Sequence, residues 1–418
     1  MYKTISNCRV CGNSRLKTVM NLGNLKLTGV FPLPGENVDS SPLELVKCDG
    51  ENCCGLVQLR HSCDSRQMYG MNYGYRSGLN KSMIEHLTTI TTHIMEIVHM
   101  DKNDIVVDIG SNDGTLLGTY DFDPTDNIRR IGIDPTAIKF KKYYKPGIDI
   151  VEDFFSAEAF KSICGNEKAK IITSIAMFYD LEDPISFAKQ IEDCLAWDGV
   201  WVFEQSYMPY MIQAKSFDTV CQEHLEYYGM KQIEWIIKAA DLKIIDVDFN
   251  NVNGGSFRIT ASKKESPYMA SPKVNQARVA EDVGGYNTFE VFEAFADAVD
   301  DCKKSCIDFL NKCKTEGKKV IGYGASTKGN VLLQYFDIDS KLLPYIAEVN
   351  SDKFGHVTPG SNIPIISEDE AREMKPDFFF VLPWHFKNNI LDKENDYLKM
   401  SGCKMVFPLP KFSIEAGR

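Results

Sequence analysis

The 418-residue chain has no apolar stretch that approaches the ~18–20 residues of a membrane-spanning helix. Its N-terminus, Met1 to Cys8, lacks the apolar core of a secretory signal, so we expect no signal peptide. Short internal repeats and low-complexity segments are missing as well. Hydrophobic residues make up 44% of the chain and charged residues 25%, an ordinary balance that excludes disordered and collagen-like proteins.

Positive charge is in short supply. Lys and Arg total 47 against 58 Asp and Glu, which leaves a formal net charge of −11. An acidic chain without a basic block binds nucleic acids and anionic membranes poorly, so we expect neither as a partner. Any phosphate-bearing ligand must then be held by local features rather than by the overall field.

Cysteine is plentiful, but the pattern does not favour a disulfide framework. The thirteen cysteines are an odd number, and the chain is too long to need such a framework. Together with the missing signal, this predicts a reducing, cytoplasmic setting in which the cysteines are thiols, metal ligands or core residues. Six of them fall within the first 70 residues: Cys8, Cys11, Cys48, Cys53, Cys54 and Cys63.

The spacing of these cysteines predicts a structural zinc site. Cys8 and Cys11 form a C-x2-C turn, and a second cluster follows 36 residues later with Cys48, Cys53 and Cys54. Two such pairs supply four thiolates at ~2.3 Å from one ion and leave no open position for catalysis. We expect Cys8, Cys11, Cys48 and Cys54 as the ligands, with Cys53 as a possible replacement for Cys54. Buried or incidental thiols are the alternative.

After residue 70, short β-branched runs alternate with amphipathic stretches. This alternation predicts βαβ units, a parallel sheet and an α/β fold. The pattern stops in a polar stretch with two prolines, 264–285, which we interpret as a linker, and restarts after a helix over 288–315. Two α/β units are expected, near 100–262 and 316–413. The expected strands lie at 104–110, 131–134, 171–174, 200–204, 257–261, 319–326, 342–349 and 378–383, and helices lie near 81–99 and 184–196.

The sharpest local motif is a glycine-containing turn at the end of the first of these strands. Asp108 ends the strand, the chain turns at Gly110, and Asn112 and Gly114 lead into a helix. The turn lacks the G-x-G-x-x-G spacing of dinucleotide folds. Its D-x-G-x-x-x-G pattern is closer to the loop that meets the aminoacyl end of S-adenosylmethionine. An α/β domain with ordinary glycine turns is the alternative.

Two later positions extend this nucleotide site in chain order. Asp134 ends the next strand, where an acidic side chain accepts both ribose hydroxyls. Asp153 and Phe154 follow Asp134 along the chain, at the position where adenine usually sits. The loop, the acid and the acidic-aromatic step together predict S-adenosylmethionine as cofactor.

With these segments in hand, the chain resembles the deoxysugar C-methyltransferases, in particular those that methylate C3 of nucleotide-linked hexoses. The resemblance covers nearly the whole chain and rests on motifs that are specific only in combination. They are Cys8-x-x-Cys11, Cys54-Gly-Leu-Val-Gln58, Tyr73-Gly-Tyr75-Arg-Ser, the loop 108–114, Phe217-Asp-Thr-Val-Cys-Gln-Glu223-His224, Asn253-Gly-Gly-Ser-Phe-Arg258 and Gly322-Tyr-Gly-Ala-Ser-Thr-Lys-Gly329.

The resemblance implies a domain plan and a reaction. The plan is a small zinc-binding module (1–70), a Rossmann-like class I methyltransferase domain (71–263), a linker and helix (264–315) and a C-terminal Rossmann-like α/β domain that helps hold the nucleotide sugar (316–418). The reaction is methyl transfer to a ring carbon, often C3, of a nucleotide-linked 4-keto-deoxysugar.

The chemistry of this reaction explains the polar residues in these motifs. A carbon next to a ketone becomes nucleophilic only after it loses a proton, so a base and donors to the enolate oxygen are needed. We expect His224 as the base and Glu223 as its orienting partner. Tyr73 and Tyr75 lie in the segment that resembles the family's active-site cap, and their hydroxyls could steady the sugar or the enolate. Tyr179, in the place of a family histidine, is the remaining expected catalytic residue.

Substrate contacts are expected from Tyr73, Asn253 and Lys328, the last of these beside a helix N-terminus suited to a pyrophosphate. This chain has Cys221, Tyr179 and Asn253 where better-known members tend to have tyrosine, histidine and histidine, respectively. The exact sugar, the ring position and the stereochemistry therefore stay open.

Three rival functions remain at this point. A sugar O-methyltransferase would need a base but no enolate. An oxidoreductase would use the 322–329 turn with NAD. A zinc-stapled carbohydrate-binding module would have no chemistry at His224.

Overall fold

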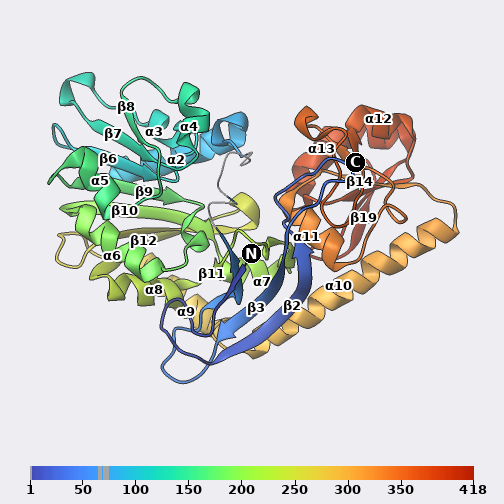
Figure 1. Cartoon of the computed structure of the whole chain (residues 1–418), viewed down its shortest axis with the longest axis horizontal. Helices are drawn as coiled ribbons and strands as arrows, with labels where there is room; N and C mark the ends of the chain where they lie inside the picture. Colours follow the sequence, from blue (N-terminus) through green and yellow to red (C-terminus); the bar gives the residue numbers. More distant parts are fainter. Residues whose placement is uncertain (1, 65–67, 69–74) are drawn as a thin grey trace.

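The computed structural model describes residues 2–64, 68 and 75–418, so Tyr73 lies outside the described residues. Figure 1 shows two α/β bodies on opposite sides of the molecule, with the long strands of the N-terminal segment and the helix α10 (Glu290–Thr315) running between them. In the described part of the chain, no helix is both long and apolar enough to cross a membrane.

The first α/β body is built on a seven-stranded sheet. Its strands run in the order β12-β13-β10-β9-β6-β7-β8, and β13 runs in the opposite direction to the other six. The chain order reverses between β6 and β9, which is where open α/β sheets bind their ligands. The strands are β6 (Ile105–Ile109), β7 (Arg129–Ile133), β8 (Ile148–Val151), β9 (Ala169–Ile175), β10 (Leu195–Ser206), β12 (Leu242–Asn250) and β13 (Ser256–Lys263).

Helices cover both faces of this sheet because its strands are apolar on both sides. Val106 packs with α2 and α3 on one face, while its neighbour Val107 belongs to the core under α5, α6 and α8. The helices are α2 (Lys81–Ile97), α3 (Thr115–Thr119), α4 (Ala137–Phe140), α5 (Ala157–Cys164), α6 (Pro184–Cys194), α7 (Met208–Gln213) and α8 (Met230–Ala239). The helices predicted near 81–99 and 184–196 are confirmed.

The N-terminal segment forms an antiparallel sheet of order β11-β4-β3-β2. Its members are β2 (Leu16–Lys26), β3 (Ser40–Cys48), β4 (Val57–Leu59) and β11 (Glu226–Tyr227), while β1 (Tyr2–Thr4) pairs with β5 (His61–Cys63). The strand β11 comes from the middle of the chain and begins two residues after His224. The N-terminal sheet is therefore completed by the segment that carries the predicted base.

The predicted linker contains a helix that sequence reasoning missed. Residues 272–283 form α9 (Pro272–Val283), which opens with a proline in its first turn and buries Val274, Ala277 and Glu281. Proline suits that position because its missing N–H would be unbonded there anyway. The helix predicted over 288–315 is confirmed as α10.

The second α/β body has a sheet of order β16-β15-β14-β17-β18-β19, parallel except for β19. The strand predicted over 342–349 is shorter than expected and begins only at Ile346, two residues after Pro344. The elements are β14 (Val320–Tyr323), α11 (Thr327–Tyr335), β15 (Ile346–Glu348), β16 (Ile365–Ser367), α12 (Glu368–Glu373), β17 (Phe378–Val381), α13 (Lys387–Ser401), β18 (Lys404–Phe407) and β19 (Ser413–Glu415).

Buried hydrogen bonds join the two bodies. The indole Nε1 of Trp384 donates to Oδ2 of Asp218 at 2.8 Å, and the Asp218 side chain is fully buried. Asn330 Nδ2 donates to the carbonyl of Thr28 at 2.8 Å. Met20 of β2, Phe217 of the segment between α7 and β11, and Leu332 of α11 belong to one hydrophobic core. Apolar packing therefore joins the N-terminal sheet and both α/β bodies.

We expect Trp384→Phe to lower the thermal stability of the protein. The substitution keeps an aromatic ring but leaves Oδ2 of a fully buried Asp218 without its donor, which costs about 1–3 kcal/mol. Differential scanning calorimetry should show a Tm several degrees below that of the wild type. Trp197→Phe is the matched control because Trp197 is 67% exposed; equal shifts for the two variants would contradict the prediction.

Candidate active site and metal centre

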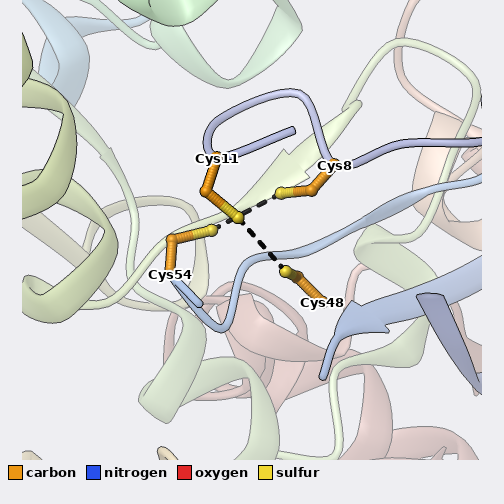
Figure 2. A group of neighbouring side chains, drawn as sticks. All are labelled: Cys8, Cys11, Cys48 and Cys54. Atoms are coloured by element: carbon orange, nitrogen blue, oxygen red, sulfur yellow. Dashed lines mark hydrogen bonds between the residues drawn. The ribbon is translucent and has the colours of Figure 1, made fainter. Parts of the chain in front are cut away.

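Four cysteine thiols converge at one point of the N-terminal module (Figure 2). The sulfurs of Cys8 and Cys54 lie 3.4 Å apart and those of Cys11 and Cys48 lie 3.5 Å apart, and all four fall within 4.8 Å of one another. A tetrahedral zinc ion with ~2.3 Å bonds would hold its sulfurs ~3.8 Å apart. The thiols are thus already spaced for zinc.

The protonation of the cluster also suits a metal. Hydrogen bonds from Cys48 and Cys54 lower the pKa of the Cys8 thiol, which favours the thiolate form that binds a metal. Cys53 behaves differently: its sulfur donates to the Gly50 carbonyl at 3.0 Å, and burial raises its pKa. The structure therefore favours Cys54, not Cys53, as the fourth ligand.

The metal centre contacts the rest of the molecule directly. Arg9 lies between two of the ligands, and its Nη1 donates to the Leu59 carbonyl at 2.6 Å. The carbonyl of Cys54 accepts from Gln232 Nε2 of α8 at 3.0 Å. The Arg9 bond holds the first cysteine turn within the N-terminal module, and the Gln232 bond ties the second turn to the seven-stranded body.

A cavity of about 1150 Å³ opens at the carboxyl edge of the seven-stranded sheet, and all three parts of the chain line it. Binding sites for a single ligand usually measure about 300–1000 Å³, so this cavity has room for a cofactor and a substrate together. Among the predicted site residues, its wall includes Tyr75, Asp108, Gly110, Asn112, Asp134, Phe154, Tyr179, Glu223, His224, Asn253 and Lys328. We call it the central cavity.

The loop after β6 forms one wall of the central cavity. Gly110 has a φ of +71°, and a Cβ there would lie 3.2 Å from Met177 Cγ, so glycine is required for both conformation and space. Asp108 is buried, which raises its pKa to about 7, and it accepts the Thr173 hydroxyl at 2.6 Å. Gly114 lies outside the wall; its φ is +74°, and a Cβ there would lie 2.6 Å from the Tyr144 ring.

Asn112 ties this loop to the segment before α2. Its Nδ2 donates to the Tyr75 carbonyl at 3.1 Å, its Oδ1 accepts from the Ser77 N–H at 3.0 Å, and its own N–H donates to Asp134 Oδ2 at 2.8 Å. Asp134 also accepts the Thr136 hydroxyl at 2.6 Å. The segment beginning at Tyr75 is thereby placed over the loop, and Asp134 is oriented at the end of β7.

The two residues predicted beside adenine, Asp153 and Phe154, differ in whether they line the central cavity. Phe154 is 38% exposed and lines the central cavity. Asp153 is exposed and does not line it; its Oδ1 accepts the N–H of Phe154 at 2.8 Å. Asp153 therefore orients the neighbouring backbone in this structure.

His224 lies in the wall of the cavity with a defined orientation. Its Nδ1 lies 3.0 Å from the Thr219 carbonyl, which can only accept, so Nδ1 carries the hydrogen and Nε2 keeps its lone pair. The Tyr179 ring centroid lies 4.5 Å from that of His224. Burial, with a smaller effect from the charge of Lys328, lowers the pKa of His224 to about 4, so the ring is neutral at pH 7.

The expected orienting role of Glu223 is wrong for this structure, because the Thr219 carbonyl holds Nδ1 of His224 instead. Glu223 lines the central cavity separately, and its Oε2 is buried without a hydrogen-bond partner among the described residues. Burial raises the pKa of Glu223. A Cβ at Gly29 would lie 2.4 Å from Glu223 Oε1, so the N-terminal segment packs directly against this carboxyl.

The second α/β body contributes the far wall. Lys328 Nζ donates to the Asn253 carbonyl at 2.9 Å, and Asn253 has a φ of +56°. Lys328 lies in the first turn of α11, whose N-cap Ser326 accepts the Gly329 N–H at 3.0 Å. The loop carrying Asn253 and the start of α11 thus meet at the cavity.

Comparisons with known proteins agree with this architecture. Three family models match consecutive parts of the chain: "Putative zinc binding domain" over 8–69, "Methyltransferase domain" over 83–247 and "C-methyltransferase C-terminal domain" over 251–410. The C-methyltransferase NovU of Streptomyces niveus is 26% identical over 417 residues, which cover 98% of this chain and 97% of NovU. The chain is a C-methyltransferase that resembles NovU and carries an N-terminal domain of the zinc-binding type. It depends on S-adenosylmethionine.

Solved structures resemble a smaller part of this C-methyltransferase. An S-adenosylmethionine-dependent methyltransferase of Clostridium acetobutylicum is 13% identical with a TM-score of 0.31, covering 44% of this chain and 92% of its own. The CcbJ methyltransferase of Streptomyces caelestis is 10% identical with a TM-score of 0.33, covering 42% and 89%. Likenesses this weak support no functional statement.

Sequence reasoning missed several residues that line the central cavity of the C-methyltransferase or support a residue that does. Thr219 acts through its backbone carbonyl, which no side-chain motif reveals. Gln205 is 2% exposed at the end of β10, and both of its amide atoms lack partners among the described residues. His86 and Glu204 also line the cavity and lie 2.5 Å apart. A polar pair such as Glu204-Gln205 closing an apolar strand is the signal that could have indicated them.

We expect Cys54→Ser to remove zinc from the C-methyltransferase and Cys53→Ser to retain it. Cys54 lies in the thiol cluster, whereas the Cys53 sulfur donates to a backbone carbonyl instead. Inductively coupled plasma mass spectrometry should find about one zinc per chain in the wild type and in Cys53→Ser. It should find well under half of that in Cys54→Ser; the reverse pattern would make Cys53 the ligand.

Proposed function

We propose that this enzyme transfers the methyl group of S-adenosylmethionine to a ring carbon, C3, of a nucleotide-linked 4-keto-deoxysugar through an enolate, with His224 as the base. One observation carries the proposal. The cofactor loop, a neutral and oriented imidazole, and the lysine at the start of α11 face the same cavity. A reaction that brings a sulfonium donor, a carbon acid and a phosphorylated substrate together needs these three elements.

The imidazole of His224 meets the first requirement for such a base. With Nδ1–H engaged by the Thr219 carbonyl, the lone pair of Nε2 is available to take a proton from the sugar carbon. Burial keeps the ring neutral at physiological pH. The electron pair left on carbon is shared with the adjacent keto oxygen as an enolate.

Phenol hydroxyls suit the developing enolate oxygen. Tyr75 and Tyr179 both line the cavity. Burial raises the pKa of Tyr75, so its hydroxyl keeps its proton and can donate to an anionic oxygen. Donors placed in advance lower the barrier because the charge they stabilise exists only during the reaction.

The cofactor supplies an electrophilic methyl group on a sulfonium, and the chain's role toward it is positioning. The loop with Gly110 and the carboxyl of Asp134 are proposed to hold the methionyl and ribose parts. Phe154 would contact the adenine. The zinc ion, with four thiolate ligands and no open position, would have no part in the chemistry.

The remaining wall suits a hydroxylated, phosphorylated substrate. Among the described residues, nothing makes a hydrogen bond to the buried Glu223 Oε2 or to the amide of Gln205, and such atoms are costly unless a ligand or water bonds to them. Lys328 and the backbone at the start of α11 would bind the diphosphate, and Asn253 would contact the sugar. Tyr73, also expected to contact the substrate, stays a prediction.

We expect His224→Ala to abolish proton exchange next to the ketone. The test incubates dTDP-linked 4-keto-6-deoxyglucose with saturating S-adenosylhomocysteine in deuterated water and follows the ring protons by NMR. The wild type should incorporate deuterium at C3. In the variant the rate of incorporation should be at least about 10²-fold lower, since only the base is lost. Binding of S-adenosylhomocysteine should not change.

The pH dependence of this exchange sharpens the test. The imidazole accepts a proton only in its neutral form, so exchange should stay level from pH 8 to about pH 5 and fall toward the pKa of about 4. An absence of exchange in the wild type with this sugar and with related keto-sugars would favour an acceptor other than an enolate. Unchanged exchange in His224→Ala would assign the base elsewhere.

We expect Lys328→Met to raise the KM for the nucleotide sugar by roughly 10–100-fold, because a charge-assisted bond to the diphosphate is lost. Calorimetry should find the affinity for S-adenosylhomocysteine within twofold of the wild type. Lys341→Met, on the same α/β body and with a side chain that is 81% exposed, is the control. An unchanged KM in Lys328→Met would place the diphosphate away from α11.

A further inference from the structure

One polar pair in the central cavity has no role in the reaction described so far. His86 comes from α2 and Glu204 from the end of β10, and Nε2 of the histidine lies 2.5 Å from Oε1 of the glutamate. Both residues line the central cavity. The side chains are 12% and 4% exposed, so the pair is set into the wall rather than on the surface.

Glu204 is held firmly enough to position its partner. Its second oxygen, Oε2, accepts from Asn250 Nδ2 of β12 at 2.9 Å, and Arg258 Nη1 of β13 lies 4.0 Å from it. Three elements therefore fix the carboxylate, and the guanidinium of Arg258 balances its charge. A carboxylate fixed in this way determines the direction of the imidazole that bonds to it.

The other ring nitrogen of His86 remains for a ligand. Nε2 is engaged by Glu204, and no residue in the described ranges makes a hydrogen bond to Nδ1. Nδ1 is also not among the buried unpartnered atoms, so it retains contact with the cavity. The pair thus presents a single polar atom to whatever occupies this part of the site.

The order of the strands indicates which part of the cofactor this is. The adenine and ribose positions, Phe154 and Asp134, follow β8 and β7, and the glycine turn follows β6. Continuing along the same edge, the next strands are β9 and β10, and Glu204 lies two residues before the end of β10. Adjacent strands are ~4.8 Å apart, so a cofactor that starts at β8 points its amino-acid end toward β9 and β10.

Further contacts place α2 beside the aminoacyl loop. Asn112 holds the segment just before α2 through the Tyr75 carbonyl and the Ser77 N–H. The first residues of α2 that face the cavity are Met83, His86 and Leu87. His86 therefore lies in the second turn of a helix whose preceding segment is bonded to the cofactor loop.

We propose that His86, positioned by Glu204, binds the α-carboxylate of S-adenosylmethionine. The imidazolium has a hydrogen on each nitrogen and bridges two carboxylates, donating Nε2–H to Glu204 and Nδ1–H to the cofactor. His86 is thus a cofactor-binding residue, and Glu204 is a positioning residue that acts through it. The inference depends on the use of S-adenosylmethionine and is independent of which sugar is methylated.

The test is calorimetric binding of cofactor fragments to the full-length zinc-loaded enzyme. S-adenosylhomocysteine carries the α-carboxylate, decarboxylated S-adenosylmethionine keeps only the amine of the amino-acid end, and methylthioadenosine lacks that end altogether. For His86→Ala we expect affinity for S-adenosylhomocysteine to fall by about 10–100-fold, the scale of a charge-assisted hydrogen bond. Affinity for the two probes without a carboxylate should change by less than twofold.

Two more variants keep the result interpretable. Glu204→Gln retains the shape of the side chain and should weaken S-adenosylhomocysteine selectively, but less than His86→Ala does. His93→Ala is the matched control, since His93 lies on the same helix and does not line the central cavity. It should leave all three affinities unchanged.

Three outcomes would overturn the proposal. Equal losses for all three probes in His86→Ala would assign the pair a structural role only. Equal losses for S-adenosylhomocysteine and decarboxylated S-adenosylmethionine would mean that the ring meets the amine instead. Unchanged affinities in both His86→Ala and Glu204→Gln, with normal melting temperatures, would remove the pair from the cofactor site.

Discussion

The hydrogen bond between His224 Nδ1 and the Thr219 carbonyl is the interaction on which the rest of the site depends. It selects the tautomer of a buried imidazole, and it exists only because the short segment between α7 and α8 is held from several directions. Trp384 holds Asp218 from one side, and β11 pairs with β4 on the other. The segment has hydrogen bonds of its own, such as those from the Tyr227 hydroxyl to the carbonyls of Thr219 and His224, and neighbouring domains add further contacts that hold it.

This dependence gives each domain a reason to be present. The four thiols join the turn at Cys8 to the end of β3, and the N-terminal sheet is completed by a strand that follows His224, the proposed base. The second α/β body adds Lys328 to one wall of the cavity and Trp384 to the support of the loop. The seven-stranded body alone would leave the imidazole exposed, with a more ordinary pKa and a less certain orientation.

Much of this could be predicted from local sequence. The alternation of strands and helices, the glycine turn after β6 and the paired cysteines all reflect constraints that act within a few residues, such as backbone conformation or the bite of two thiolates on one ion. The linker prediction failed at α9 because its proline marks the start of a helix as readily as a loop. The partner of His224 was predicted from adjacency in sequence, but a glutamate next to a histidine in the chain points elsewhere in a turn.

The sequence by itself determined the α/β class, the thiol cluster apart from the choice between Cys53 and Cys54, and the edge of the sheet at which the central cavity opens. Only the tertiary structure decided which groups meet there. His86 and Glu204 are separated by 118 residues, and Asp218 and Trp384 by 166. No local rule links such positions, because their approach depends on how whole sheets and helices pack, and burial then sets the protonation of the groups brought together.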